Sequence, residues 1–174
     1  MLFRSPVVTP SSFITWFQAQ QACANAGKRL LTNAEWQMAA AGTPDPGTDD
    51  ETTDCNVSGP PFAKTPTGSR SKCKSNYEVF DMVGNVWEWV ADWIQDKSDV
   101  DVVLISSVLY GKDVIAGIDE NGPDGFPVAL TRGGGLGDGV STDAGVFALR
   151  TTPPSGSGGG IGFGDVTFGF RCAR

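Results

Sequence analysis

Residues 81–90 of the chain read DMVGNVWEWV and combine a glycine-containing turn with the start of a strand. Alternation from Val86 onward places Trp87 and Trp89 on one face of that strand and Glu88 on the opposite face. Two indole side chains on one face indicate a buried core beneath them. The stretch therefore predicts a turn that leads into a strand packed against the core.

The same stretch carries two carboxylates, Asp81 and Glu88, on either side of the Gly84-Asn85 turn. Carboxylate oxygens, together with turn carbonyls that a strand ladder does not use, are the ligands that calcium prefers. The alternative is a tight turn whose carboxylates are solvated, because acidic residues are common at turns. On spacing alone this alternative is the more frequent one.

Length and charge limit the class of protein. The 174 residues are enough for a single domain that buries about two-thirds of its unfolded surface. The formal charge of −7 makes nucleic acid an unexpected partner. No apolar run approaches the ~18 residues of a membrane span, and residues 1–10 lack the hydrophobic core of a signal peptide. We therefore expect no membrane insertion by this chain and no export signal within this sequence.

The chain contains no histidine, which excludes Ser-His-Asp and Cys-His catalysis and histidine-based zinc or iron sites. Its four cysteines are Cys23, Cys55, Cys73 and Cys172. Their spacing is too wide for a C-x-x-C zinc site, and an even number allows two disulfides, which favours an oxidising compartment. The alternative is four reduced, buried cysteines in a cytosolic protein.

Two capping boxes predict two helices. Thr15 and Gln18 open the first, over residues 16–26, with a buried stripe formed by Trp16, Ala19, Cys23 and Ala26. Gly27 supplies its left-handed stop. The second box, Thr32 and Glu35, opens a helix that ends near Gly42, and Leu31 before the cap is placed to pack against Trp36.

The remaining segments give weaker signals. The 17 residues between Cys55 and Cys73 are rich in Pro, Gly, Ser and Thr and have few apolar side chains to pack. A disulfide between these two cysteines would close that loop and contribute on the order of 3 kcal/mol in the chain-entropy model. Residues 96–128 mix an apolar run with a Gly/Asp/Pro loop and indicate little. Residues 167–174 alternate as one last strand.

Taken in order, several blocks resemble the formylglycine-generating enzyme, or sulfatase-modifying factor, family. The blocks are Trp16 and Cys23 with Gly27-Lys28-Arg29-Leu30, Thr32 with Ala34-Glu35-Trp36, then residues 81–89, Arg132-Gly133-Gly134 and Gly169-Phe170-Arg171-Cys172. The resemblance implies an α+β protein with the C-type-lectin-like fold, a small mixed sheet with two helices and long loops. It spans residues 16–174, with 96–128 unmatched.

The resemblance also implies an organisation for the single domain, residues 1–174. Family members are usually longer at the N-terminus, so residues 1–15 are expected to be a short, truncated lead-in. Residues 16–95 correspond to the family scaffold, residues 96–130 form an insert, and residues 131–174 are expected to form a variable region.

The resemblance also implies roles for particular residues. Positions equivalent to Asp81, Gly84, Val86 and Glu88 hold a structural calcium ion in the family, through two side chains and two carbonyls. A second family calcium site would start at Asn56, but no downstream acid matches it.

The family disulfide between first helix and last strand corresponds to Cys23 and Cys172. The copper-binding cysteine pair of the enzymes has no counterpart, because residues 135–170 contain no cysteine. We therefore expect no enzymatic activity.

The composition of residues 132–174 differs from the rest of the chain. Lys, Glu, Gln, Met and Trp make up 24 of the first 131 residues, so about eight would be expected among these 43, and none is present. An NNC codon cannot encode these five residue types, and NNC codons arise when the adenines of AAC codons are randomised. This resembles the variable region of proteins diversified by a diversity-generating retroelement, a branch of the same lectin-like family. The alternative is an ordinary Gly/Ser/Thr-rich loop.

We call residues 136–160 the variable segment and expect a solvent-facing recognition surface there, bracketed by Arg132-Gly133-Gly134 and Gly169-Phe170-Arg171-Cys172. Loops commonly carry recognition while the scaffold carries stability. The expected ligand-binding positions are Leu136, Gly137, Asp138, Val140, Ser141, Thr142, Arg150, Thr151, Thr152, Gly156, Ser157, Gly158 and Gly159.

The sequence thus predicts a binding protein with a hypervariable face, whose partner is a protein or a cell-surface ligand. We expect it outside the cell, on a cell surface or on a virion surface. The alternative is a catalytically inactive relative of the enzymes that serves as a structural domain. A near-identical, adenine-rich template repeat beside a reverse transcriptase gene would favour the first.

Overall fold

The computed structural model describes residues 8–44, 49–57, 63–94, 108–110, 113–116, 127–135, 144–152 and 168–174. In chain order the elements are α1 (Trp16–Asn25), β1 (Arg29–Leu30), α2 (Asn33–Ala40), β2 (Trp87–Ile94), β3 (Val108–Tyr110), β4 (Asp113–Ala116), β5 (Val128–Arg132), β6 (Leu149–Thr152), β7 (Phe168–Phe170) and β8 (Cys172–Ala173). No helix in these described ranges is long and apolar enough to span a bilayer.

Both helices begin where the capping boxes predict. The Thr15 hydroxyl accepts a hydrogen bond from the Gln18 amide while the Gln18 side chain accepts one from the Thr15 amide, and Thr32 and Glu35 repeat this exchange. Gly27 follows α1 with φ +67°. The prediction was wrong at Ala26, which is exposed because α1 ends at Asn25 and Ala26 is its C-cap.

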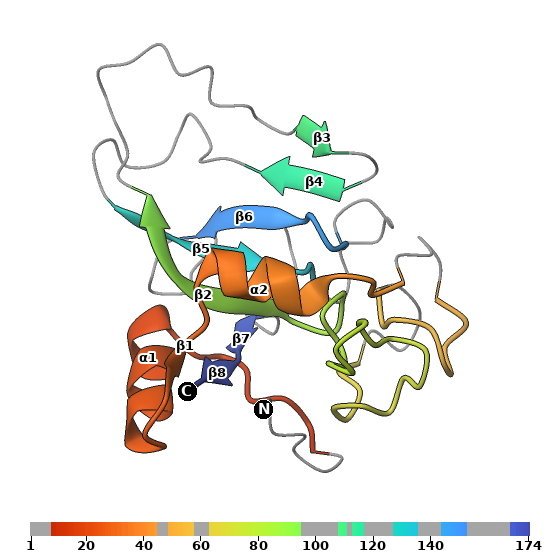
Figure 1. Cartoon of the computed structure of the whole chain (residues 1–174), viewed down its shortest axis with the longest axis horizontal. Coiled ribbons are helices and arrows are strands. Elements are labelled where there is room, and N and C mark those ends of the chain that lie inside the picture. Colours follow the sequence, from red (N-terminus) through yellow and green to blue (C-terminus); the bar gives the residue numbers. More distant parts are fainter. Residues whose placement is uncertain are drawn as a thin grey trace.

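The strands form a six-stranded mixed sheet in the order β3-β4-β6-β5-β2-β7 and a two-stranded sheet of β1 and β8. β2 pairs antiparallel with β5 and parallel with β7, so it lies inside the larger sheet. Figure 1 shows α2 across the middle of this sheet and α1 below it, near β8. The expected α+β class, a small mixed sheet with two helices, is confirmed.

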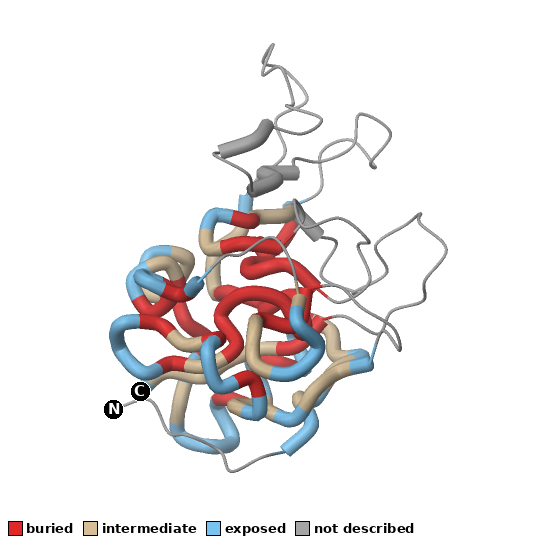
Figure 2. Tube along the Cα trace, turned by 90° about the vertical axis from the view of Figure 1, so that its right-hand side faces the viewer, coloured by how far each residue is buried: buried red, intermediate tan, exposed pale blue. Residues whose placement is uncertain are grey.

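The predicted alternation of residues 87–90 is confirmed, and it divides the core into two sides. Trp87 and Trp89 pack with Trp16 of α1 in one cluster, which also contains Ala19, Cys23, Leu30, Ala129, Ala148 and Phe168. Val90 packs on the other side with Trp36 of α2, and that cluster also contains Leu31, Ala39, Ala40, Val79, Met82 and Leu130. Figure 2 shows these buried segments at the centre of the described chain, with exposed residues around them.

Two findings at the C-terminus and in the insert correct or extend the sequence analysis. Residues 167–174 do not form one strand: the chain changes sheets at Arg171, β7 pairing with β2 and β8 with β1. The insert contributes β3 and β4, and β4 pairs parallel to β6. β6 is therefore an inner strand, with β5 on one side and β4 on the other.

Both expected disulfides are present. Cys23 of α1 is bonded to Cys172 of β8, 149 residues further along the chain. Cys55 is bonded to Cys73 and closes the loop between them. These two bonds use all four cysteines of the chain, so no free thiol remains.

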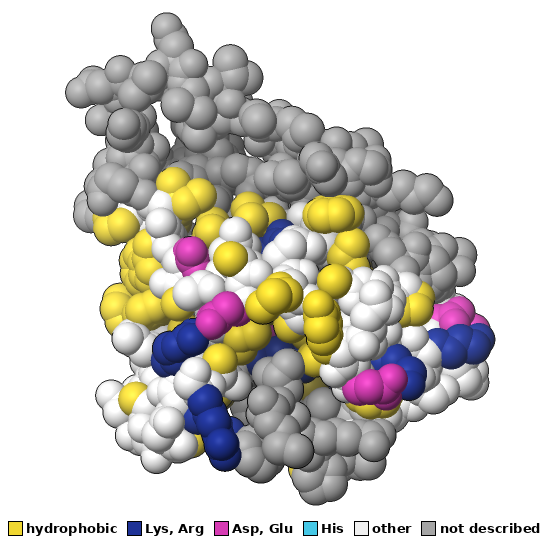
Figure 3. Space-filling model, in the orientation of Figure 1, with side chains coloured by type: hydrophobic (Ala, Val, Ile, Leu, Met, Phe, Trp, Pro, Cys, Tyr) yellow, Lys and Arg dark blue, Asp and Glu magenta, His cyan; other side chains and the backbone are white. Residues whose placement is uncertain are grey.

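On the face seen in Figure 3, most of the charged side chains lie beside a side chain of opposite charge, with hydrophobic side chains between these pairs. The described part of this face therefore carries no large basic patch of the kind that binds a nucleic-acid backbone.

The packing predicts different costs for two aromatic truncations. Trp87 is buried, so Trp87→Ala should lower the free energy of unfolding by about 3–5 kcal/mol. Phe170, expected from the sequence to be equally buried, is only partly covered, so Phe170→Ala should cost less, about 1–2 kcal/mol. Guanidinium denaturation of both variants measures the difference. Equal losses would show that Phe170 is as well buried as Trp87.

Candidate functional site

The turn before β2 holds three residues with positive φ, Asp81 at 57°, Gly84 at 74° and Asn85 at 67°. A side chain at Gly84 would place its Cβ 2.4 Å from the Asn56 carbonyl oxygen, so only glycine fits. The buried Asn85 side chain fixes the neighbouring loop, since its Oδ1 accepts from the Thr65 amide at 2.9 Å and its Nδ2 donates to the Thr65 carbonyl. The turn is thus fixed against Asn56 and Thr65, which lie in the preceding loop.

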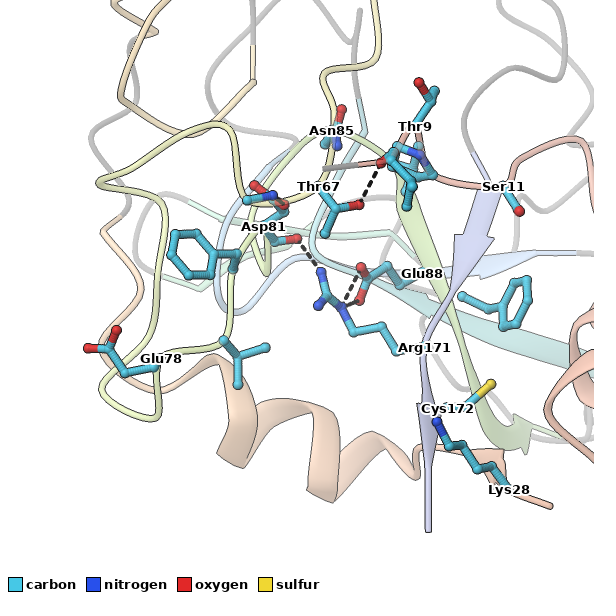
Figure 4. A pocket seen from close by; sticks show the side chains of 17 residues that line it. Thr9, Ser11, Lys28, Thr67, Glu78, Asp81, Asn85, Glu88, Arg171 and Cys172 are labelled. Carbon is cyan, nitrogen blue, oxygen red and sulfur yellow. Dashed lines mark hydrogen bonds and ion pairs between the residues drawn. The ribbon is translucent and has the colours of Figure 1, made fainter. Parts of the chain in front are cut away.

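Both carboxylates of this stretch are buried, with Asp81 and Glu88 each 5% exposed. The interpretation of a turn with solvated carboxylates is therefore wrong. Both oxygens of Glu88 accept from Arg171 Nε at 2.7 Å, and Oε2 also accepts from Trp36 Nε1 at 2.8 Å. Arg171 Nη2 donates to the Asp81 carbonyl oxygen at 2.9 Å (Figure 4). Arg171 thus joins the turn to the strand.

Counted by themselves, the two carboxylates and the Arg171 guanidinium do not balance, although the charge of Arg70 also reaches Asp81. Burial raises the pKa of Asp81, while the hydrogen bond from the Gly68 amide and the charge of Arg171 lower it by less. Burial alone would lower the pKa of Arg171, but the charge and hydrogen bonds of Glu88, together with the charge of Asp81, outweigh it and the net pKa is raised. With both acids ionised, the three side chains carry a charge of −1.

A cavity of about 340 Å³ opens on this cluster, and Asp81, Val86 and Glu88 are among its lining residues. Three of the four expected calcium ligands therefore face one space, and the excess negative charge and the oxygen donors fit a divalent cation. Two contacts compete with an ion. Arg171 is hydrogen-bonded to the Glu88 carboxylate, and the Gly84 carbonyl accepts a hydrogen bond from the Val86 amide at 2.8 Å. A calcium ion here would share Glu88 with Arg171.

Within the described ranges, no group of three or more Asp, Glu, Cys or His side chains is placed to hold a metal. A metal at the turn would therefore depend on two carboxylates and on main-chain carbonyls. At Asn56, where no matching acid was found in the sequence, the side-chain oxygen accepts from Arg70 at 3.5 Å. Arg70 also forms a buried ion pair with Asp49 at 3.0 Å. This second position is thus occupied by a guanidinium group.

The structure describes only part of the variable segment. Arg150, Thr151 and Thr152 lie in β6, and Arg150 is half-buried. The other expected positions lie outside the described residues, namely Leu136, Gly137, Asp138, Val140, Ser141, Thr142, Gly156, Ser157, Gly158 and Gly159.

Residues 144–148, immediately before β6, divide between core and surface. Ala144 and Ala148 are buried, whereas Phe147 is 41% exposed. The expectation of a solvent-facing segment throughout residues 136–160 is therefore too broad. Phe147 was missed because it was judged only as one residue of a small-residue loop. Its large apolar side chain in an otherwise Gly/Ser/Thr-rich stretch is the signal that could have identified it.

Comparison with known proteins places these features in context. The sulfatase-modifying factor enzyme 1-like domain family matches residues 3–174. The serine/threonine-protein kinase pkn1 of Chlamydia caviae is 27% identical over 170 residues, which are 92% of this chain and 23% of the kinase. The formylglycine-generating enzyme of Thermomonospora curvata is 34% identical over 101 residues, 48% of this chain and 33% of that enzyme. The chain thus spans a third or less of the length of these two relatives.

Among solved structures, the U1 variant of the major tropism determinant superposes with a TM-score of 0.55 over 91% of this chain and 36% of that one, at 18% identity. At this identity the likeness concerns the fold, which agrees with the two helices and small mixed sheets described above. From the match over residues 3–174, the chain belongs to the sulfatase-modifying factor enzyme 1-like domain family.

Proposed function

We propose that this chain is a ligand-binding domain whose variable segment, residues 136–160, recognises a partner and is diversified by a diversity-generating retroelement. The observation that carries the proposal is the absence of Lys, Glu, Gln, Met and Trp from Arg132 to the C-terminus. The last residue of these five types in the chain is Glu120, so the depleted stretch already includes β5 and continues through the whole variable segment.

The chemistry of the chain supports binding over catalysis. Histidine is absent, and the cysteines that could act as nucleophiles or copper ligands are all bonded to each other. The buried Asp81, Glu88 and Arg171 are bonded mainly to one another and to neighbouring scaffold groups, which is typical of a structural cluster. We therefore propose that the domain performs no reaction of its own.

The partner is proposed to be a protein or a cell-surface ligand, met outside the cell or on a virion surface. Two disulfides favour an oxidising environment. The similarity in fold to the major tropism determinant is compatible with such a role.

A second candidate is a catalytically inactive member of the family that serves as a structural domain. The observation in its favour is that 92% of this chain matches only 23% of a much longer kinase, so similar domains occur as parts of larger proteins. Sequencing the surrounding locus separates the candidates. A template repeat that differs from the coding region of residues 132–174 mainly at adenines, beside a reverse transcriptase gene, favours diversification, and its absence favours the structural domain.

We further propose that calcium binds at Asp81, Val86 and Glu88 with the Gly84 carbonyl, as a structural ion. In the metal-free protein the raised pKa of Asp81 means that the folded state holds this proton more tightly than the unfolded state. The contribution of Asp81 to stability is therefore highest below its unfolded pKa and falls as the pH rises through the raised folded pKa. A bound cation would offset that loss at neutral pH.

Chelation tests the calcium proposal. At calcium concentrations about a hundredfold above Kd, the ion should stabilise the fold by about 2.7 kcal/mol, so EDTA should lower the melting temperature at pH 7. Asp81→Asn should remove the response to calcium and, in EDTA, melt at or above the wild type, because the buried charge is gone. Glu78→Gln, at an exposed acid of the same cavity, is the control and should retain the response. Identical wild-type melting curves in calcium and EDTA would refute binding.

Tolerance to substitution tests the recognition surface. Replacing Asp138, Ser141, Thr142, Arg150 or Ser157 by other small or polar residues should change the free energy of unfolding by less than about 0.5 kcal/mol. The matched control is Asp49→Asn in the scaffold, which breaks the buried pair with Arg70 and should cost about 3 kcal/mol. Denaturation curves measure both. If the variable-segment substitutions cost as much as Asp49→Asn, the segment belongs to the core and the binding proposal fails.

A further inference from the structure

Residues at the end of β5 hold the described part of the variable segment by bonding to the main-chain atoms of that segment. Arg132 is 3% exposed. Its Nη1 donates to the carbonyl oxygens of Phe147 at 3.0 Å and Ala148 at 2.9 Å, and its Nη2 donates to that of Val146 at 3.4 Å. One guanidinium thus binds three consecutive carbonyl groups. Such bonds do not depend on which side chains those three residues carry.

The scaffold fixes this guanidinium from the other side. Its carbon lies 4.8 Å from the centroid of the Trp36 ring, and Nη2 also donates to the Gln37 side-chain oxygen. Both partners belong to α2, a helix outside the variable segment. The orientation of Arg132 is therefore set by residues that diversification of the segment would leave unchanged.

The residues on either side of Arg132 act in the same way. The Thr131 hydroxyl donates to the Arg150 carbonyl at 3.2 Å. The Gly133 amide donates to the Ala148 carbonyl, and the Gly133 carbonyl accepts from the Gly145 amide, each at 3.2 Å. A side chain at Gly133 would place its Cβ 2.8 Å from the Met82 carbonyl, so this close approach requires glycine. Residues 131–133 thus contact the main chain from 145 to 150.

Side-chain burial in this stretch separates fixed from changeable positions. Ala144 and Ala148 are buried in the core, so a larger side chain at either position would have to displace packed neighbours. Phe147 is exposed and Arg150 is half-buried, so their side chains reach the surface from a main chain that is already fixed. Fixing the main chain before binding reduces the entropy lost when a partner binds.

We propose that Thr131, Arg132 and Gly133 form a main-chain clamp that positions residues 145–150 of the variable segment whatever side chains its exposed positions carry, and that Phe147 and Arg150 are the specificity-determining residues of its described part. The clamp stands on geometry alone, whereas the role of Phe147 and Arg150 rests on the proposed function. The partner surface is expected to contain an apolar patch for Phe147 beside an acidic group for Arg150.

Amide hydrogen exchange tests the clamp without any ligand. Arg132→Lys keeps the charge but cannot bind three carbonyls at once, so exchange at Gly133, Gly145 and Ala148 should accelerate about tenfold or more. In the double variant Phe147→Ser/Arg150→Ser, the exchange rates of the same amides should stay within about twofold of the wild-type rates, because the clamp bonds to main-chain atoms and not to these side chains. Arg29→Lys, at an exposed ion pair with Glu35, is the matched control and should change none of them.

Two results would overturn the clamp: unchanged exchange in Arg132→Lys, or acceleration in the double variant as large as in Arg132→Lys. If Arg132→Lys does not fold, Thr131→Val makes the same test. It removes only the hydroxyl bonded to the Arg150 carbonyl and should accelerate exchange in β6. Unchanged exchange in Thr131→Val would then overturn the clamp.

Selection tests the link to function. Two phage libraries carry NNC codons at positions 138, 141, 142, 147, 150 and 157, one built on the wild-type sequence (the wild-type frame) and one built on the Arg132→Lys variant (the Arg132→Lys frame). Both are selected on immobilised lysozyme. Enrichment of binders from the wild-type frame alone, with dominant residues at 147 and 150, supports the proposal. Equal enrichment from both frames overturns it. If no binder emerges from either frame while exchange behaves as expected, the binding function fails and the clamp stands.

Discussion

The buried carboxylate of Glu88 connects three parts of the chain that are far apart in sequence. It accepts hydrogen bonds from Trp36 in α2 and from Arg171 between β7 and β8, and it belongs to β2 itself. A buried charge is stable only when it is paired and hydrogen-bonded, so none of these elements can shift without exposing an unmatched group. Through its bond to the Asp81 carbonyl, Arg171 extends this constraint to the turn. The position of β2 is thereby tied to α2 and to the C-terminal segment of the chain.

Local signals in the sequence predicted the local structure well. The two capping boxes, the stop at Gly27 and the alternation of Trp87 and Trp89 each depend on residues within one turn or strand, and all are confirmed. The pairing of Cys23 with Cys172 came from the family resemblance, because four cysteines alone allow three connectivities.

Contacts between distant segments were the part that could not be predicted. Nothing near Glu88 in the sequence identifies Arg171 as its partner, so the choice between metal ligand and solvated acid missed the ion pair. The break at Arg171 was missed because alternation continues through residues 167–174 although the hydrogen-bonding partner changes from β2 to β1. The pairing of β4 with β6 was missed for the same reason, since short apolar runs do not specify which strand they join.

The disulfide between Cys23 and Cys172 has a mechanical consequence. It joins α1 to β8 and encloses the 148 residues that separate the two cysteines in a covalent loop. A pulling force applied through residues before Cys23 and after Cys172 would pass along the S–S bond. It would not load the hydrogen bonds of the larger sheet, since all six of its strands lie within the loop. Shear on a tethered copy of this domain would therefore leave β2, β5 and β6 in register for as long as that bond remains oxidised.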